Sequence, residues 1–391
     1  MSSSPAGARV YLDHASAAPW HPAALAAYRH VAESLPGDPS RRHREGRAAR
    51  DLLEQARGAV AAAFGGAAER TAFTSGGTEA VHLAILGAAA ANRTRPARIL
   101  SSAVEHSAVL AAADAAARQI GGEHVLLPVD GLGRLDLDAL RAELGRGALL
   151  VNVMHTSHEV GTLQPVDEAA ALCREHDVLL HVDACQSAGR LPVGAEALGA
   201  DFLSVSAAKF GGGRGTGALL WSPRARLAPQ FGGDERERRM RAGLEHLPGA
   251  AAMAEALLQL APREPGGAAA AEAARCDALR RMLRTALPAA IDDLVVHGPD
   301  DDSAPHIVAV SALYCDGESM VSELDRRGFA VHSGSSCATT SGEPSHVLVA
   351  MGALTHGHIR VSVGPGVEQD DAAAFTAALA EVVAALRASK V

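Results

Sequence analysis

The sequence predicts an α/β fold: a large domain with a mostly parallel sheet covered by helices, and a smaller α+β domain toward the C-terminus. The 391 residues are 48% hydrophobic and 21% charged, so the chain can bury a sizeable core. Between residues 73 and 221, short apolar runs bounded by turn residues alternate with stretches of helical length, as in parallel sheets. After Pro248 the pattern changes to alanine-rich helices and more widely spaced strands, which indicates a second unit.

Each element of the large domain is predicted from its own run of residues. The apolar runs predict strands at Arg98–Ser101, Leu149–Met154, Val178–Val182, Phe202–Ser206 and Gly217–Trp221. The segments between them predict helices at Thr78–Ala91, Ala108–Gln119 and Asp167–Glu175. The sites of such sheets lie beyond the carboxyl ends of the strands, so that edge is where functional side chains are expected.

The smaller unit has fewer predicted elements. They are a helix at Gly249–Leu260, strands around His306–Leu313, Ala330–Ser333 and His358–Val363, and a last helix at Asp371–Ala388. We therefore expect a large domain of residues 21–255 and a small domain formed by residues 1–20 together with 256–391.

Composition argues against several classes of function. The formal charge of −9 does not favour binding to nucleic acid. The first ten residues contain no apolar signal segment, and the alanine-rich stretches are too short or too charged to cross a membrane, so a cytoplasmic protein is expected. The five cysteines are odd in number and form no C-x-x-C pair, which argues against a disulfide framework and against a metal site.

Lysine is scarce in this chain. Only two of the 36 basic residues are lysines, Lys209 and Lys390. Arginine supplies positive charge everywhere else, but it cannot be deprotonated and so cannot attack an aldehyde, whereas a lysine amine can. The count alone leaves a chance residue as an equal alternative, and the neighbours of Lys209 decide between the two.

Residues 73–79 (FTSGGTE) read as a strand that passes through a glycine turn into a helix. Glycines such as Gly77 let the main chain approach an anion closely, and the free N–H groups of the helix start point at it. The hydroxyl of Thr78 can add a further donor. An ordinary capped helix explains the same turn in most proteins, so this segment alone is a weak signal.

Two further strand ends carry a carboxylate and the lysine. The run 181–187 (HVDACQS) ends a buried strand at Asp183, which could cap a turn or, beside a pyridine nitrogen, keep that nitrogen protonated. The run 204–213 (SVSAAKFGGG) delivers Lys209 into a glycine-rich loop that lacks phosphate-loop spacing. The two residues are 26 positions apart, about one strand–helix–strand unit, so they are expected to end neighbouring strands.

With these motifs in place, the sequence resembles the fold-type I, class V enzymes that use pyridoxal 5'-phosphate, and within them the cysteine desulfurases. The resemblance runs nearly end to end. The matching segments are 11–13 (YLD), 37–40 (GDPS) with His43 and Gly46, 74–79 (TSGGTE), 105–106 (EH), 159–161 (EVG), 164–165 (QP), 181–187, the segment ending at Lys209, 333–338 (SGSSCA), 343–345 (EPS) and 359–362 (IRVS).

The resemblance implies a cofactor site made of eight residues: Gly77, Thr78, His106, His158, Asp183, Gln186, Ser206 and Lys209. Lys209 would hold pyridoxal phosphate as a Schiff base and later move protons, and Asp183 would pair with the ring nitrogen. His106 would stack on the ring and assist proton transfer. Alone, a histidine such as His106 is more often structural than catalytic.

The remaining implied roles concern the ring oxygen, the phosphate and the substrate. Gln186 and His158 would lie near the phenolic oxygen of the ring, and Thr78 and Ser206 would hold the phosphate. His158 would also meet the substrate, and Arg360 would bind its carboxylate in bidentate fashion. Alone, Arg360 would more often be a surface charge.

Cys337 separates the possible functions within the family. It lies in a run of serine, glycine and threonine, where a structural cysteine would gain little apolar packing. The resemblance implies that this thiol takes the sulfur of L-cysteine, so that L-alanine leaves and a persulfide stays for transfer to an acceptor protein or biosynthetic partner. The alternatives are another class V enzyme, an aminotransferase or a lyase acting on carbon–sulfur bonds or selenocysteine, and a cofactor-poor binding or sulfur-relay protein. The resemblance also implies a homodimer.

Three positions depart from the family's pattern. Ala208 stands where the family usually has a histidine that contacts the phosphate, and His158 stands where it usually has asparagine. Leu244 replaces a threonine that reaches the cofactor phosphate of the neighbouring subunit. Two phosphate donors are thus missing, and a hydrogen bond to a charged group is worth roughly 1.5–3 kcal/mol. We therefore expect weaker cofactor retention than in typical members.

Overall fold

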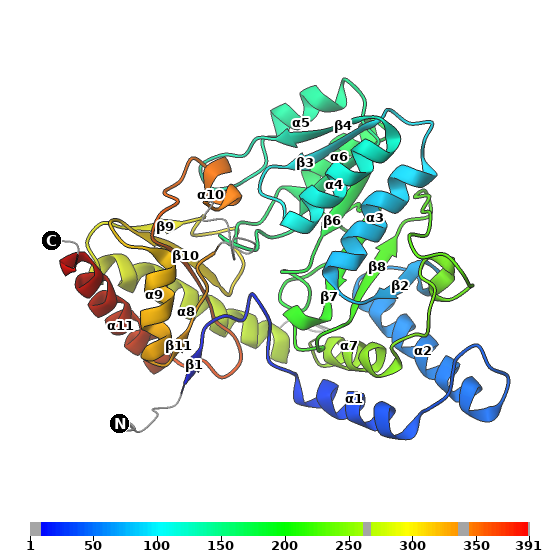
Figure 1. Cartoon of the computed structure of the whole chain (residues 1–391), viewed down its shortest axis with the longest axis horizontal. Helices are drawn as coiled ribbons and strands as arrows, with labels where there is room; N and C mark the ends of the chain where they lie inside the picture. Colours follow the sequence, from blue (N-terminus) through cyan, green and yellow to red (C-terminus); the bar gives the residue numbers. More distant parts are fainter. Residues whose placement is uncertain (1–8, 261–266, 335–343, 390–391) are drawn as a thin grey trace.

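The computed structural model describes residues 9–260, 267–334 and 344–389 (Figure 1). A large helix-covered sheet forms one part of the molecule, and a smaller sheet with its own helices forms the other. The first and last described residues both lie in the smaller part, so the chain begins there, crosses to the large part and returns.

The large part is built on a seven-stranded sheet with the strand order β2-β8-β7-β6-β5-β3-β4. The strands are β2 (Thr71–Thr74), β3 (Arg98–Ser102), β4 (Glu123–Leu127), β5 (Leu150–Met154), β6 (Leu179–Asp183), β7 (Phe202–Ser206) and β8 (Gly217–Trp221). β8 runs antiparallel to both of its neighbours, and the pairs from β7 to β4 are parallel. The carboxyl ends of β5, β6 and β7 therefore meet at one edge.

Helices cover both faces of this sheet, as its apolar runs require. Successive strand residues point to opposite faces, so Leu150 packs with α3 (Gly77–Ala91) and α4 (Ser107–Ile120), whereas Val151 packs on the other side. That other side is covered by α1 (Pro22–Ser34), α2 (Arg44–Ala63), α5 (Leu137–Leu144), α6 (Val166–Glu175) and α7 (Leu247–Leu260). Alanine fills much of both interfaces, which lets these helices approach the strands closely.

The smaller part contains an antiparallel sheet in the order β12-β10-β9. Its elements are α8 (Ala268–Ala290), β9 (Leu294–His297), β10 (Ile307–Ala312), α9 (Gly317–Arg326), α10 (His346–Ala350), β12 (His358–Ser362) and α11 (Gln369–Ala388). A separate parallel pair joins β1 (Val10–Tyr11) to β11 (Phe329–Ala330). The residues after β1 then run along β12, with an isolated bridge between Asp13 and Ser362, and carry the chain to the large part.

The observed elements agree with the predicted ones at the buried, mostly apolar strands of the large sheet. β5, β7 and β8 match within one residue, and the fold class is confirmed. No element was predicted from the sequence at α1, α2, α5, α9, α10, β1, β4 or β9. The predicted strand Ala330–Ser333 is wrong in extent: β11 ends at Ala330, and His332 instead makes an isolated bridge to Arg360 on β12. Within the described ranges, no helix combines the length and apolar character needed to span a bilayer.

Candidate active site

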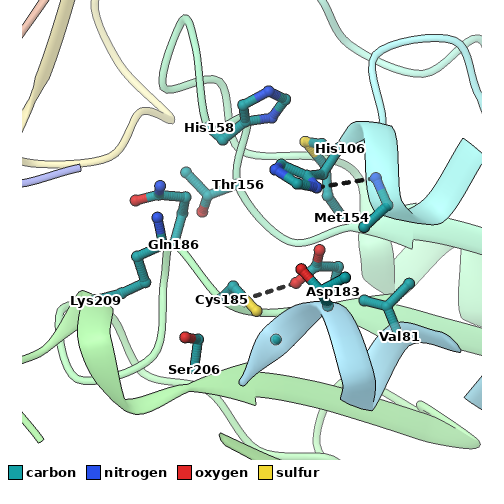
Figure 2. A pocket seen from close by; sticks show the side chains of 13 residues that line it. Val81, His106, Met154, Thr156, His158, Asp183, Cys185, Gln186, Ser206 and Lys209 are labelled. Carbon is teal, nitrogen blue, oxygen red and sulfur yellow. Dashed lines mark hydrogen bonds between the residues drawn. The ribbon is translucent and has the colours of Figure 1, made fainter. Parts of the chain in front are cut away.

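A cavity of about 140 Å³ lies beyond the carboxyl ends of β5, β6 and β7, where an α/β sheet is expected to hold its site. Figure 2 shows side chains from several elements facing this space. The residues that line it are Gly77, Thr78, Val81, His106, Ala108, Met154, Thr156, His158, Asp183, Cys185, Gln186, Ser206 and Lys209. All eight residues implied for the cofactor site are thus brought together in one cavity.

Lys209 reaches the cavity from a short 3-10 turn, η2 (Ala207–Lys209), directly after β7. Its Nζ donates hydrogen bonds to the main-chain oxygens of Ala15 at 2.9 Å and Ser16 at 2.8 Å. Burial lowers the pKa of Lys209, and the positive charge of Arg360 lowers this pKa further. A lowered pKa increases the fraction of neutral amine, which is the form that attacks a carbonyl.

Asp183 is the last residue of β6, and its carboxylate faces the cavity. One carboxylate oxygen accepts a hydrogen bond of 2.9 Å from the main-chain N–H of Cys185. Two residues earlier on β6, the buried His181 bonds Asn152 Oδ1 at 3.0 Å and Ser204 Oγ at 2.9 Å on the neighbouring strands. This polar row fixes the strands beneath the site, so the carboxylate position is set by the sheet itself.

His106 and His158 form one wall of the cavity. Their rings meet edge to face with centroids 5.1 Å apart. His106 caps the start of α4, and its Nδ1 accepts from the N–H of Ala108 at 3.1 Å, so its ring proton belongs on Nε2. Burial lowers the pKa of His106, and lowers that of His158 well below its usual value. His158 is therefore a neutral imidazole, and neither of its nitrogens has a hydrogen-bond partner among the residues described.

The opposite end of the cavity is the start of α3. Gly76 caps this helix without a side-chain hydrogen bond from the described chain, so the first N–H groups of α3 stay open beside Gly77 and Thr78. A Cβ on Gly77 would lie 2.5 Å from Cys185 Sγ, so only glycine fits. Open N–H groups at a helix start bind phosphate well. Ser206 lies next to these N–H groups, because its Cβ is 3.3 Å from the position that a Cβ on Gly77 would take.

Taken together, the residues present fit pyridoxal phosphate. The start of α3 with Thr78 and Ser206 can hold its phosphate, and Asp183 can pair with its ring nitrogen. On the other side, the unpartnered ring nitrogens of His158 and the Oε1 of Gln186, which has no partner in the described chain, can meet polar ring groups. Lys209 supplies the amine.

Arg360 and Cys337 complete the predicted site residues, and Leu244 is one of the positions that depart from the family's pattern. Arg360 is buried and does not line the cavity, but it donates to the main-chain oxygen of His158 at 2.8 Å and so lies next to it. Cys337 lies outside the described residues. Leu244 is 66% exposed, and its aliphatic side chain has no hydrogen-bond donor that could replace the expected threonine hydroxyl.

Several cavity residues were not identified from the sequence. Met154 ends β5 and Thr156 lies two residues further on, and only the sheet order, with β5 next to β6, shows that they belong to the site. Glu105 lies just below: its Oε1 accepts from the N–H of Met154 at 2.6 Å, and burial raises the pKa of this carboxyl well above its usual value. The adjacent pair Glu105-His106 was a sequence signal that pointed to this position.

Comparisons with known proteins agree with this geometry. Residues 10–375 match the family described as aminotransferase class V. A cysteine desulfurase IscS from Dictyoglomus turgidum is 36% identical over 93% of this chain and 91% of its own length. Another from Anaeromyxobacter sp. (strain Fw109-5) is 38% identical over 91% and 87%. The chain belongs to the cysteine desulfurase group of the class V aminotransferases.

Solved structures support the same family assignment. A NifS-like protein superposes with a TM-score of 0.88 at 26% identity, covering 96% of this chain and 99% of that protein. The class V and cysteine desulfurase families depend on pyridoxal phosphate. The three positions that depart from the family's pattern, Ala208, His158 and Leu244, therefore lie in a chain that belongs to the cysteine desulfurase group.

Proposed function

We propose that this protein is a pyridoxal-phosphate-dependent cysteine desulfurase that converts L-cysteine to L-alanine and leaves a persulfide on Cys337. The observation that carries this proposal is the convergence of Lys209 and Asp183 on one cavity from the ends of neighbouring strands. An amine that condenses with an aldehyde and a carboxylate that keeps the attached ring electron-poor are the two groups this chemistry requires. The desulfurase relatives support the same substrate.

The reaction balances without an added oxidant. The Cys337 thiolate attacks the sulfur of L-cysteine, an S–S bond forms, and the carbon–sulfur bond breaks. When bound, the cofactor supplies the electron sink that makes this carbon–sulfur cleavage possible. The thiol proton and the proton that completes the methyl group of alanine are moved by site residues, to which we assign Lys209 and the Nε2–H of His106. The persulfide then passes to an acceptor.

His158 and Gln186 orient the ring from its other side. The neutral imidazole of His158 offers one N–H donor at the cavity wall, and the amide of Gln186 is held by its Nε2 donating to Ala15 O at 2.7 Å. Arg360 is proposed to bind the substrate carboxylate beside His158. Because all three side chains are nearly fully buried, they exclude water from the reacting atoms.

The test is to incubate the cofactor-loaded protein with L-cysteine alone and measure alanine, sulfide and the mass of the Cys337 peptide. We expect alanine together with one extra sulfur on Cys337. Lys209→Ala should abolish borohydride-trapped cofactor and all product. Cys337→Ser should bind cofactor normally but yield no persulfide. Full sulfur release by Cys337→Ser would contradict the desulfurase proposal and favour a lyase or an aminotransferase.

We further propose a cytoplasmic homodimer, with large and small domains as divided above. The exposed apolar side chains of Phe231 and Leu244 lie on the segment between β8 and α7 and suit contact with a second copy. Light scattering after size-exclusion chromatography tests this, since Leu244→Asp should weaken the dimer. A monomeric wild-type protein with full activity would refute it.

A further inference from the structure

In Arg360, the guanidinium nitrogen Nη2, which a substrate carboxylate would need for bidentate binding, already donates all of its hydrogen bonds to the protein. Its side chain is 4% exposed. Nη2 donates two hydrogen bonds, to Asp13 Oδ1 at 3.1 Å and to Ser16 Oγ at 2.7 Å. Nη1 donates to the main-chain oxygen of His158 at 2.8 Å. Both N–H groups of Nη2 are therefore already in use.

The shape of the guanidinium means that these two hydrogen bonds of Nη2 block bidentate binding of a carboxylate. A carboxylate can accept two parallel N–H bonds along either of two edges, the one formed by Nη1 and Nη2 or the one formed by Nε and Nη2. Nη2 belongs to both edges. Bidentate binding of a substrate carboxylate to Arg360 consequently requires that Asp13 or Ser16 first release Nη2.

Asp13 is the partner that can be exchanged at little cost. A buried guanidinium without an anion is strongly disfavoured, so Arg360 in the free enzyme needs a carboxylate beside it. The main chain of Asp13 is held by its bridge to Ser362 on β12, so its side chain can rotate while the backbone stays in place. That side chain is 17% exposed, which gives the released carboxylate access to water.

We propose that Asp13 is a placeholder for the substrate carboxylate: it pairs with Arg360 in the free enzyme and is exchanged for the amino acid on binding. This rests on the proposed function for the identity of the substrate. The exchange leaves the buried guanidinium paired with a carboxylate both before and after binding, and it makes Asp13 a residue that sets substrate affinity and selects for carboxylate-bearing amines.

The test compares two probes on the holoenzyme by calorimetry: L-alanine, which has a carboxylate, and ethylamine, which lacks one. Asp13→Asn removes the competing charge, so the affinity for L-alanine relative to ethylamine should rise on the order of tenfold. Ser16→Ala frees one N–H of the same nitrogen and should raise the ratio less. In an Arg360→Ala background, Asp13→Asn should leave the ratio unchanged.

The matched control is Asp302→Asn, which breaks an Arg134–Asp302 pair of the same 3.1 Å length on the exposed surface. Its ratio should equal that of the wild type. A ratio that falls or stays constant in Asp13→Asn would overturn the proposal, because Asp13 would then position Arg360 or do nothing. If Asp13→Asn does not fold, Ser16→Ala decides in the same way.

The two proposals fail differently. Neither probe needs Cys337, so a protein that releases no sulfur from L-cysteine but shows the raised ratio contradicts the desulfurase function and keeps the exchange. If the wild type takes up no cofactor, the same variants are titrated with acetate. Tighter acetate binding by Asp13→Asn supports the exchange, and equal or weaker binding refutes it.

Discussion

Glu159 offers a sharp test of the electrostatics next to the site. This carboxyl is 1% exposed and directly follows His158. Its Oε1 lies 3.4 Å from Nε2 of His358. Burial lowers the pKa of His358 to about 3, so this ring is uncharged and gives Glu159 no positive partner. Burial accordingly raises the pKa of Glu159 from its ordinary 4.5 to about 7, although the Ser345 hydroxyl and Arg360 act in the opposite direction.

The sign and size of the effect follow from proton linkage. The folded protein binds this proton more tightly than the unfolded chain, so the contribution to stability is fully present below pH 4.5. It is lost as the pH rises toward the folded pKa of about 7, and above that it no longer changes. At about 1.4 kcal/mol per pKa unit, the total loss is on the order of 3 kcal/mol.

Glu159→Gln replaces the carboxyl by an uncharged group of the same shape. We expect the variant to gain stability over the wild type as the pH rises from 5 to 8, by up to about 3 kcal/mol. Thermal melts of both proteins at several pH values measure this difference. The matched control is Glu235→Gln, whose side chain is 81% exposed and pairs with Arg239, and its melting curve should follow the wild type. Parallel pH dependence of wild type and Glu159→Gln would refute the reasoning.

The remaining predictions concern the cofactor and the loop that follows β8. Gly77→Ala should weaken cofactor affinity at least tenfold in titrations of the apo-protein, because the new Cβ meets Cys185 Sγ, and adding Cys185→Ala should restore part of the loss. Leu244→Thr should tighten cofactor binding on the order of tenfold by returning a phosphate donor, and unchanged affinity would count against weak retention. Glu237→Ala should lower the free energy of unfolding by about 3–5 kcal/mol in denaturant titrations, because it leaves the buried guanidinium of Arg57 without its carboxylate partner. A loss below about 1 kcal/mol would show that the pair is not buried in solution.

The fold could be predicted where both sheet faces are covered. β5, β6 and β7 are buried along their whole length, so each is mostly apolar, with one central polar residue: Asn152, His181 or Ser204. β4 escaped prediction because it is the edge strand, with Glu123 and Leu126 both exposed, and its pattern lacks a continuous apolar run. The two-domain boundary at residue 255 stays a prediction.

The site could be predicted only as far as residues carry their own chemical signal. Lys209 and Asp183 did so together with the Thr78 turn, because each residue alone has an ordinary structural explanation and only their combination at neighbouring strand ends carries the signal. Asp13 did not, since nothing in its sequence neighbourhood shows that it lies beside Arg360, 347 positions away. Contacts between the start of the chain and β12 arise from the return of the chain to the smaller part, and a strand pattern contains no information on that pairing.

The substitution at residue 158 shows how burial can preserve a function that the residue type suggests is lost. An asparagine amide offers both a donor and an acceptor, whereas a charged imidazole offers donors alone and would repel Lys209 and Arg360. Burial lowers the pKa of His158 well below its usual value, and electrostatic interactions with His106 and with the charge of Arg360 lower it further. The neutral ring then presents one donor and one acceptor, as the amide did. Burial therefore gives His158 both the donor and the acceptor that its proposed contact with the cofactor ring requires.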